Sequence, residues 1–142
     1  MIVSAKTEYA CIAVLELAAR AGSAEPVRIR EIADSQGIPS RFLVQILLPL
    51  KSAGLVHSVR GASGGYQLAK DPDEITLGEV MAVVDGQSGQ ITSNATVKTP
   101  VTRVLQSTWH KVAATEREML ESITFADLIQ KLRGHADAMY YI

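Results

Sequence analysis

The chain has 142 residues, of which 47% are apolar and 20% are charged. This length and composition predict one folded domain with an appendage, and they exclude a wholly disordered chain. A single cysteine excludes a disulfide framework, and no apolar run is long enough to span a bilayer. We therefore expect a soluble, cytoplasmic protein with no membrane partner.

The net charge of −1 conceals an uneven distribution. Residues 1–70 carry eight basic and five acidic residues, a net of +3, whereas residues 71–142 carry six and ten, a net of −4. No acid occurs between Asp34 and Asp71, although this run of 36 residues contains Arg41, Lys51, Arg60 and Lys70. A local basic surface on a near-neutral protein is typical of a polyanion site. On charge alone, a chance patch on the surface is an equal alternative.

The first half of the chain predicts three helices. Helical periodicity indicates helices over about Thr7–Arg20 and Ile29–Gln36, and Gly37 suits the left-handed turn that follows. Pro39 fits the first turn of a third helix. Pro49 is expected to kink or shorten this helix, because a proline nitrogen cannot donate a hydrogen bond. The apolar face of the third helix is formed by Phe42, Leu43, Ile46, Leu47 and Leu50.

The next segment predicts a hairpin followed by a helix. Leu55–Arg60 and Tyr66–Ala69 have the pattern of two strands joined by a glycine-rich turn. Thr76 and Glu79 have the spacing of a capping box at the start of an apolar helix.

The last third predicts a polar loop and two further helices. Residues 87–100 are rich in Gly, Ser, Thr and Asn, which is typical of a loop or a disordered segment. A long helix is expected over about Val101–Ser122, and a short one over Thr124–Arg133, where Thr124 and Asp127 have the spacing of a cap. The apolar stripe of the long helix consists of Val104, Leu105, Thr108, Val112, Met119 and Leu120.

Two helices joined by a glycine turn and followed by a hairpin predict a winged helix-turn-helix. In such motifs the start of the second helix meets base edges in the major groove of DNA. Arginine pairs with guanine, glutamine with adenine and valine with the thymine methyl group, whereas Ser40 and Lys51 are better placed for phosphates. The candidate DNA-binding residues are Arg28, Ser40, Arg41, Val44, Gln45, Lys51, His57, Arg60, Gly64 and Tyr66.

The hairpin residues have alternative interpretations. Arg60 at the wing tip suits the negative potential of a narrow minor groove, and a solvated loop charge is the alternative. The backbone N–H of Gly64 would approach a phosphate, unless the glycines serve only the turn. Tyr66 either packs under the hairpin or contacts the DNA backbone. His57 either contacts phosphate or is a solvated strand residue.

Other chemistry is not indicated by the residue pattern. Cys11 lies in an apolar helix, where packing is the default role and a redox-sensing thiol the alternative. The three histidines have no metal-binding spacing. No convergent polar constellation points to an enzyme. Trp109 fits a dimer core better than a ligand cage.

The segment "IREIADSQGIPSRFLVQILLPLKSAGLVHSVRGASGGYQLAKDPDEITLGEVMAVVDG" resembles the Rrf-two family of bacterial transcription regulators, the group that contains IscR, NsrR and CymR. The flanking segments "SAKTEYACIAVLELA" and "LQSTWHKVAATEREMLESITFADL" resemble it too. The resemblance implies a homodimer, with the long helix crossing to the partner, that binds a palindromic operator in double-stranded DNA. Carried over by position, Ser40, Arg41 and Gln45 would contact the major groove, and Arg60 and Gly64 would be wing contacts.

The sequence differs from many members of the family in the residues that would hold a cofactor. Many relatives hold an iron–sulfur cluster through three cysteines in the segment that corresponds to Gly86–Arg103, and this chain has none there. Arg103 stands where the last of these cysteines aligns, and Gln106 where a histidine ligand occurs in some members. Glu8 matches a glutamate ligand of some members, but Ile12 stands where a further ligand is expected. Since thiolates hold such clusters, we expect no intrinsic cluster and no metal or other cofactor.

The resulting expectation is a mainly α protein with a small β-hairpin wing. Residues 1–85 would form the winged helix-turn-helix domain, 86–100 a flexible loop, and 101–142 the dimerisation helix and a C-terminal helix. The predicted function is a dimeric DNA-binding transcription regulator, a repressor, controlled by a small-molecule or protein effector. The alternative is a regulatory subunit that uses the winged-helix fold to bind a protein.

Overall fold

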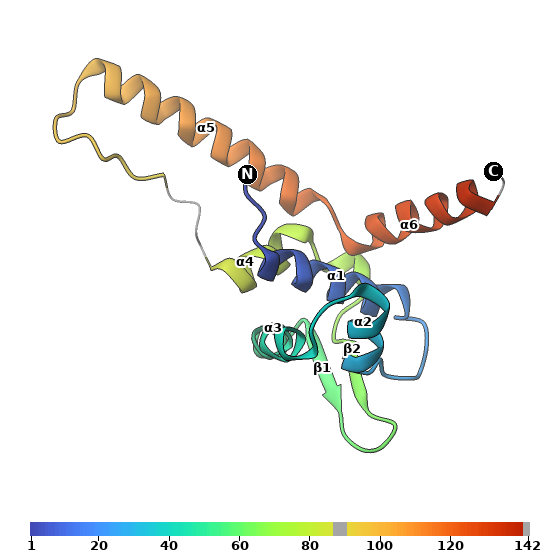
Figure 1. The fold of residues 1–142 in the computed structure, drawn as a ribbon. Coiled ribbons are helices and arrows are strands. Elements are labelled where there is room, and N and C mark those ends of the chain that lie inside the picture. Colours follow the sequence, from blue (N-terminus) through green and yellow to red (C-terminus); the bar gives the residue numbers. More distant parts are fainter. Residues whose placement is uncertain (87–90, 141–142) are drawn as a thin grey trace.

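The computed structural model describes residues 1–86 and 91–140, with side chains to residue 136. This part of the chain is mainly helical, with one antiparallel hairpin. Figure 1 shows a body that contains α1 to α4 and the hairpin, and a long helix, α5, that extends away from it. In chain order the elements are α1 (Ala5–Ala19), α2 (Ile29–Gln36), α3 (Ser40–Ser52), β1 (Val56–Val59), β2 (Gly65–Leu68), the 3₁₀ turn η1 (Pro72–Glu74), α4 (Leu77–Asp85), α5 (Pro100–Ser122) and α6 (Phe125–Tyr140).

The core is built around α1, which contacts α2, α3, α4, α6 and β2. This helix begins two residues before the predicted start, because the Ser4 side chain accepts a hydrogen bond from the N–H of Thr7 and caps it. Its small residues Ala10 and Ala13 are fully buried, which allows neighbouring helices to approach closely. Phe125 of α6 is fully buried in the same core, so the C-terminal helix returns to the body.

The helix-turn-helix forms as predicted. α2 has the predicted bounds, and Gly37 has a φ of 68°, the left-handed conformation that ends many helices. Ile38 is buried after the turn and fixes the angle between the two helices. Pro39 precedes α3 as its cap residue, one position before the predicted first turn.

Of the two effects predicted for Pro49, a kink or a shortening of α3, the shortening does not occur, and the kink stays a prediction. The helix continues through Pro49 to Ser52. Ile46, Leu47 and Leu50 on both sides of the proline are at most 1% exposed, and their packing outweighs one missing backbone hydrogen bond.

The two strands form the predicted hairpin, with β1 one residue shorter at each end and β2 shifted by one residue toward the turn. Val56 lies opposite Leu68 and Val59 opposite Gly65. Val27 extends the hairpin on the side of β2, since its N–H and C=O both bond to the backbone of Tyr66, at 2.9 and 2.8 Å. A Cβ on Gly65 would lie 2.4 Å from the Val27 carbonyl oxygen, so glycine is required for this close approach.

The later helices have side-chain caps. The Thr76 hydroxyl accepts from the N–H of Glu79, while the Glu79 carboxylate lies 3.8 Å from Lys70. Thr124 and Asp127 form the predicted reciprocal cap of α6. α6 is longer than predicted and passes Gly134, a residue that weakens a helix without ending it.

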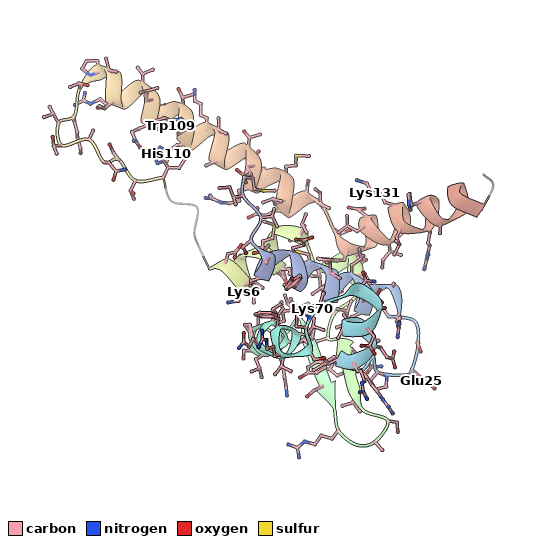
Figure 2. All side chains as sticks on the ribbon, in the orientation of Figure 1. Lys6, Glu25, Lys70, Trp109, His110 and Lys131 are labelled. Carbon is pink, nitrogen blue, oxygen red and sulfur yellow. The ribbon has the colours of Figure 1, made fainter. Side chains whose placement is uncertain are left out.

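α5 carries exposed apolar side chains on the half that lies farther from the body. Figure 2 shows Trp109 on this outer part of the helix. No described helix combines the length and apolar character needed to cross a bilayer. The apolar side chains of this half, which are 45–69% exposed, are Val101, Val104, Leu105, Trp109 and Val112.

Candidate nucleic-acid interface

One face of α3 is buried and the opposite face is open to solvent. The buried face holds four large residues that are at most 1% exposed: Leu43, Ile46, Leu47 and Leu50. The open face holds the predicted residues Ser40, Arg41, Val44 and Gln45, all of which are exposed. The structure therefore brings these four predicted residues together on one helix face. Phe42, predicted on the apolar face, is partly exposed and packs its ring 6.1 Å from that of Tyr9.

The sequence interpretation missed Leu48, which lies on the same open face. Its exposed fraction is 55%, and it follows Val44 by one helical turn. The spacing of four residues between Val44 and Leu48 was the signal in the sequence. It was hard to recognise because the neighbouring positions also hold leucine and isoleucine.

The wing lies beside the C-terminal half of α3. The ammonium group of Lys51 donates to the Ser58 hydroxyl at 2.8 Å and thereby links α3 to β1. Arg60 follows β1 directly and is exposed. Among the described residues, neither Arg41 nor Arg60 forms an ion pair. The Arg41 guanidinium lies over the Phe42 ring, 5.1 Å from its centroid, a contact that leaves its charge without an acidic partner.

Arg28 reaches the wing tip from the segment before α2. Its Nη2 donates to the carbonyl oxygen of Ala62 at 2.5 Å. Gly64 is constrained as well, because its N–H donates to the Gly61 carbonyl at 3.0 Å and a Cβ would meet the Val59 carbonyl oxygen. The N–H that was expected to approach a phosphate is thus used within the turn.

The two remaining predicted residues lie along the hairpin. Tyr66 is half-buried and packs against the core, in agreement with the packing interpretation. His57 is exposed, and its Nε2 lies 3.2 Å from Oε1 of Gln67 on the opposite strand. α3 and the wing lie on the side of the body away from α5 (Figure 1).

Comparison with known proteins gives consistent matches over the whole chain. The profile of the Rrf2 family, described as iron-dependent transcriptional regulators, matches residues 3–131. The chain is 34% identical to the HTH-type transcriptional regulator CymR of Bacillus subtilis, over the full length of both. The chain belongs to the Rrf2 family of transcriptional regulators.

Solved structures of Rrf2 regulators have the same fold. The CymR structure from B. subtilis superposes with a TM-score of 0.82 at 33% identity, covering 92% of this chain and 98% of that one. IscR of T. potens superposes with a TM-score of 0.75 at 36% identity, covering 93% and 88%. These matches confirm the predicted winged helix-turn-helix fold.

The residues of this Rrf2 chain do not fit a thiolate-held iron–sulfur cluster. Residues 86–103 contain no cysteine or histidine, and Arg103 is exposed. Cys11, the chain's only cysteine, lies in α1. Burial, and then the negative charge of Asp85, raise the pKa of its thiol to about 11, which disfavours the thiolate that binds metal.

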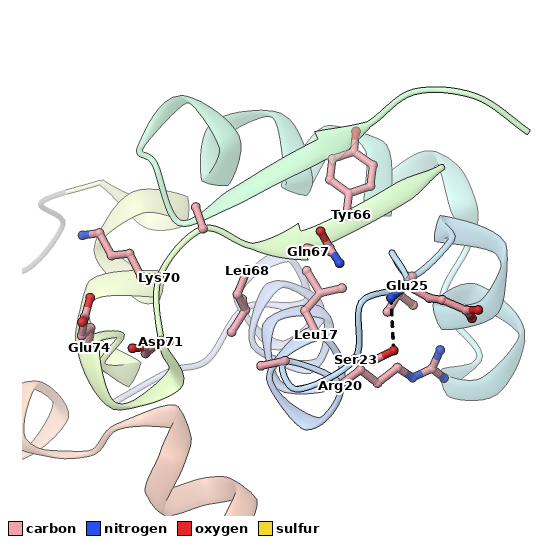
Figure 3. Close-up of a pocket in the computed structure, with 13 residues that line it drawn as sticks. Leu17, Arg20, Ser23, Glu25, Tyr66, Gln67, Leu68, Lys70, Asp71 and Glu74 are labelled. Atoms are coloured by element: carbon pink, nitrogen blue, oxygen red, sulfur yellow. Dashed lines mark hydrogen bonds between the residues drawn. The ribbon is translucent and has the colours of Figure 1, made fainter. Parts of the chain in front are cut away.

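A hollow of about 390 Å³ lies behind the wing of this Rrf2 chain, between the end of α1, residues 20–27 and β2 (Figure 3). Two of its polar side chains are engaged by neighbouring residues. Arg20 donates to Glu31 at 2.6 Å, and Gln67 donates to the Ala24 carbonyl at 3.2 Å. The hollow is also lined by the carboxylates of Glu25, Asp71 and Glu74, which do not attract a polyanion, so the DNA-facing surface is the stronger candidate site for nucleic acid.

Proposed function

We propose that this chain is a dimeric, sequence-specific repressor that binds a palindromic operator without an intrinsic iron–sulfur cluster. The observation that carries the proposal is the open face of α3, which lies within the 36 residues that contain no acid. A face of this kind combines electrostatic attraction to phosphates with side chains that recognise base edges.

The first half of α3 would enter the major groove. Arg41 suits the O6 and N7 acceptors of guanine, and Gln45 suits the edge of adenine. Ser40 at the start of the helix suits a phosphate or a base edge. Lys51 would contact phosphate while it keeps the wing beside α3 through Ser58.

The wing would place Arg60 in the adjacent minor groove. A narrow minor groove has an enhanced negative potential that attracts arginine. Arg28 would act on DNA mainly by holding the wing tip through Ala62, and His57 would contact a flanking phosphate.

Dimerisation would use the exposed apolar face of α5. Side chains such as Val104, Leu105 and Trp109 have few contacts within one chain, and a second copy would cover them. Two copies related by a two-fold axis would present their α3 helices to half-sites separated by one helical turn of DNA or more.

Regulation would act on the angle between the two DNA-binding units. A small molecule or a protein effector that alters α5 or residues 87–100 would change how well both α3 helices fit the operator. The proposal includes a cytoplasmic location, because the operator lies in chromosomal DNA, and it includes no catalytic activity.

The test is selection of bound fragments from a pool of the source organism's genomic DNA, followed by affinity measurements over a salt series. We expect one enriched palindrome and an affinity that falls steeply as salt rises. Arg60→Ala should weaken binding by about tenfold and reduce the salt slope by about one, because it removes one charge near the DNA.

The matched control is Arg133→Ala, which removes an exposed arginine from α6 and should leave affinity unchanged. Salt-sensitive binding without an enriched sequence would contradict specific recognition. A tight, salt-independent complex with a protein and no DNA affinity would favour the regulatory-subunit alternative.

A further inference from the structure

We propose that Val44 and Leu48 read thymine methyl groups at two neighbouring positions in each operator half-site. The inference rests on the proposed function and specifies the base chemistry that the open face of α3 recognises. It assigns a DNA-reading role to Leu48, the exposed leucine of this helix.

The two side chains form an apolar pair on an otherwise polar face. Val44 is 42% exposed and Leu48 is 55% exposed, while Leu47 and Leu43 beside them are fully buried. Residues four apart on a helix lie on the same side, with Cβ atoms about 6 Å apart. The open face therefore presents two apolar groups in a row along the helix axis.

The surroundings distinguish this pair from scattered surface leucines, which are common and carry no meaning by themselves. Arg41 and Gln45 stand beside Val44 on the same open face, and both carry groups that match base edges. No acid lies within the stretch that contains these residues. A surface that faces DNA through Arg41 and Gln45 also brings Val44 and Leu48 to the base edges.

The chemistry of the major groove leaves one partner for an apolar side chain. The edges of guanine, cytosine and adenine present polar donors and acceptors, and the C5 methyl group of thymine is the apolar group. Base pairs are stacked about 3.4 Å apart, so two side chains about 6 Å apart reach methyl groups within about two base pairs of each other. We therefore expect two thymines at this separation in each half-site, on either strand.

The experiment uses the full-length protein and the operator obtained by genomic selection. Each thymine of one half-site is replaced singly by deoxyuridine, which removes the methyl group and leaves the base-pairing edge unchanged. We expect a loss of affinity of about fourfold at two positions, the effect of exposing one buried methylene-sized group to water. Replacement at the other thymines should change affinity less than twofold.

Two variants connect each position to its side chain. Leu48→Ala should abolish the deoxyuridine effect at one of the two positions, and Val44→Ala should abolish it at the other. Leu48→Met, which keeps an apolar side chain, should retain the effect. Leu132→Ala is the matched control, because Leu132 is similarly exposed but lies on α6. This variant should lose affinity at the same two deoxyuridine positions as the wild type.

The outcomes separate this inference from the function on which it rests. If no deoxyuridine substitution in the operator changes its affinity for the protein, the inference is overturned, while the proposed repressor function still stands. A deoxyuridine effect that persists unchanged in both alanine variants would overturn it too. Failure to select any operator would overturn the proposed function itself and the inference with it. Because both side chains are exposed, the alanine variants should fold normally, and thermal unfolding followed by circular dichroism checks this.

Discussion

Cys11 shows how position in the fold sets the reactivity of a single side chain. The thiolate is the reactive form of cysteine, and a pKa of about 11 leaves little thiolate at neutral pH. Burial is the main cause, and the nearby Asp85 carboxylate, which accepts a hydrogen bond from Thr7 at 2.5 Å, adds to it. The packing role is therefore favoured over a redox-sensing role.

The prediction for Cys11 concerns alkylation. Iodoacetamide should react with the folded protein at neutral pH about a hundredfold more slowly than with the urea-unfolded protein, because a rise in pKa of about two units lowers the thiolate fraction by that factor. The folded-state rate should keep rising until the pH passes about 11. A reaction equally fast in both states at neutral pH would show that the thiol is exposed and reactive.

The same raised pKa has a consequence for stability. The folded state favours the neutral thiol. The contribution of Cys11 to the free energy of unfolding is therefore fully present below pH 9.0, the pKa of the thiol in the unfolded chain. It is lost as the pH rises through about 11, the pKa in the folded chain.

At the scale of elements, the wing depends on close contacts between backbones. Val27 pairs with Tyr66, and Arg28 donates to the Ala62 carbonyl, so residues 27 and 28 hold the start of β2 and the tip of the hairpin. An isolated two-stranded hairpin is marginally stable, which makes these contacts important for the position of Arg60.

The prediction for the wing is that Gly65→Ala lowers the free energy of unfolding by about 1–3 kcal/mol, the usual cost of forcing extra volume into a packed site. The added Cβ would clash with the backbone of Val27, which cannot move as a flexible side chain does. Urea unfolding measures the effect. Gly22→Ala is the control, because no atom lies within 4 Å of its added Cβ, and equal stability of the two variants would contradict the packing argument.

At the scale of the whole molecule, the apolar side chains on the outer half of α5 are exposed, and none of the described residues covers them. Trp109, the only tryptophan, is 47% exposed on this face, on the side of the molecule opposite the wing (Figures 1 and 2). A dimer formed through α5 would leave both α3 faces open to DNA.

The prediction for the assembly is a mass of about twice 15.3 kDa in solution, measured by light scattering. Leu105→Glu should give the monomer and weaken operator binding by more than tenfold, because a buried charge at the interface is unpaired and both half-sites can no longer be bound together. Leu105→Met should remain dimeric. Trp109 fluorescence should shift to longer wavelength on dilution as the dimer dissociates, and a wild-type monomer would contradict the proposal.

Much of the fold could be predicted because its signals are local. Gly37 ends α2, and Thr124 with Asp127 begins α6, through contacts within a few residues. The predicted shortening at Pro49 does not occur, because a local rule competed with the burial of Ile46, Leu47 and Leu50. Packing against α1 supplies more free energy than one backbone hydrogen bond, and this packing is not visible in the local sequence.

The sequence by itself determined the order of the elements, four of the residues on the open face of α3, and the lack of cysteines that could hold a cluster. Helical period and residue type decide these features, and both are local properties. The tertiary structure decided that Arg28 binds the wing tip, that Lys51 bonds to Ser58, and that Cys11 is shielded. Arg28 and Ala62 are 34 residues apart. Contacts over such separations depend on how the core brings the segments together. Only the folded chain therefore shows that the Arg28 guanidinium is held by a distant backbone carbonyl.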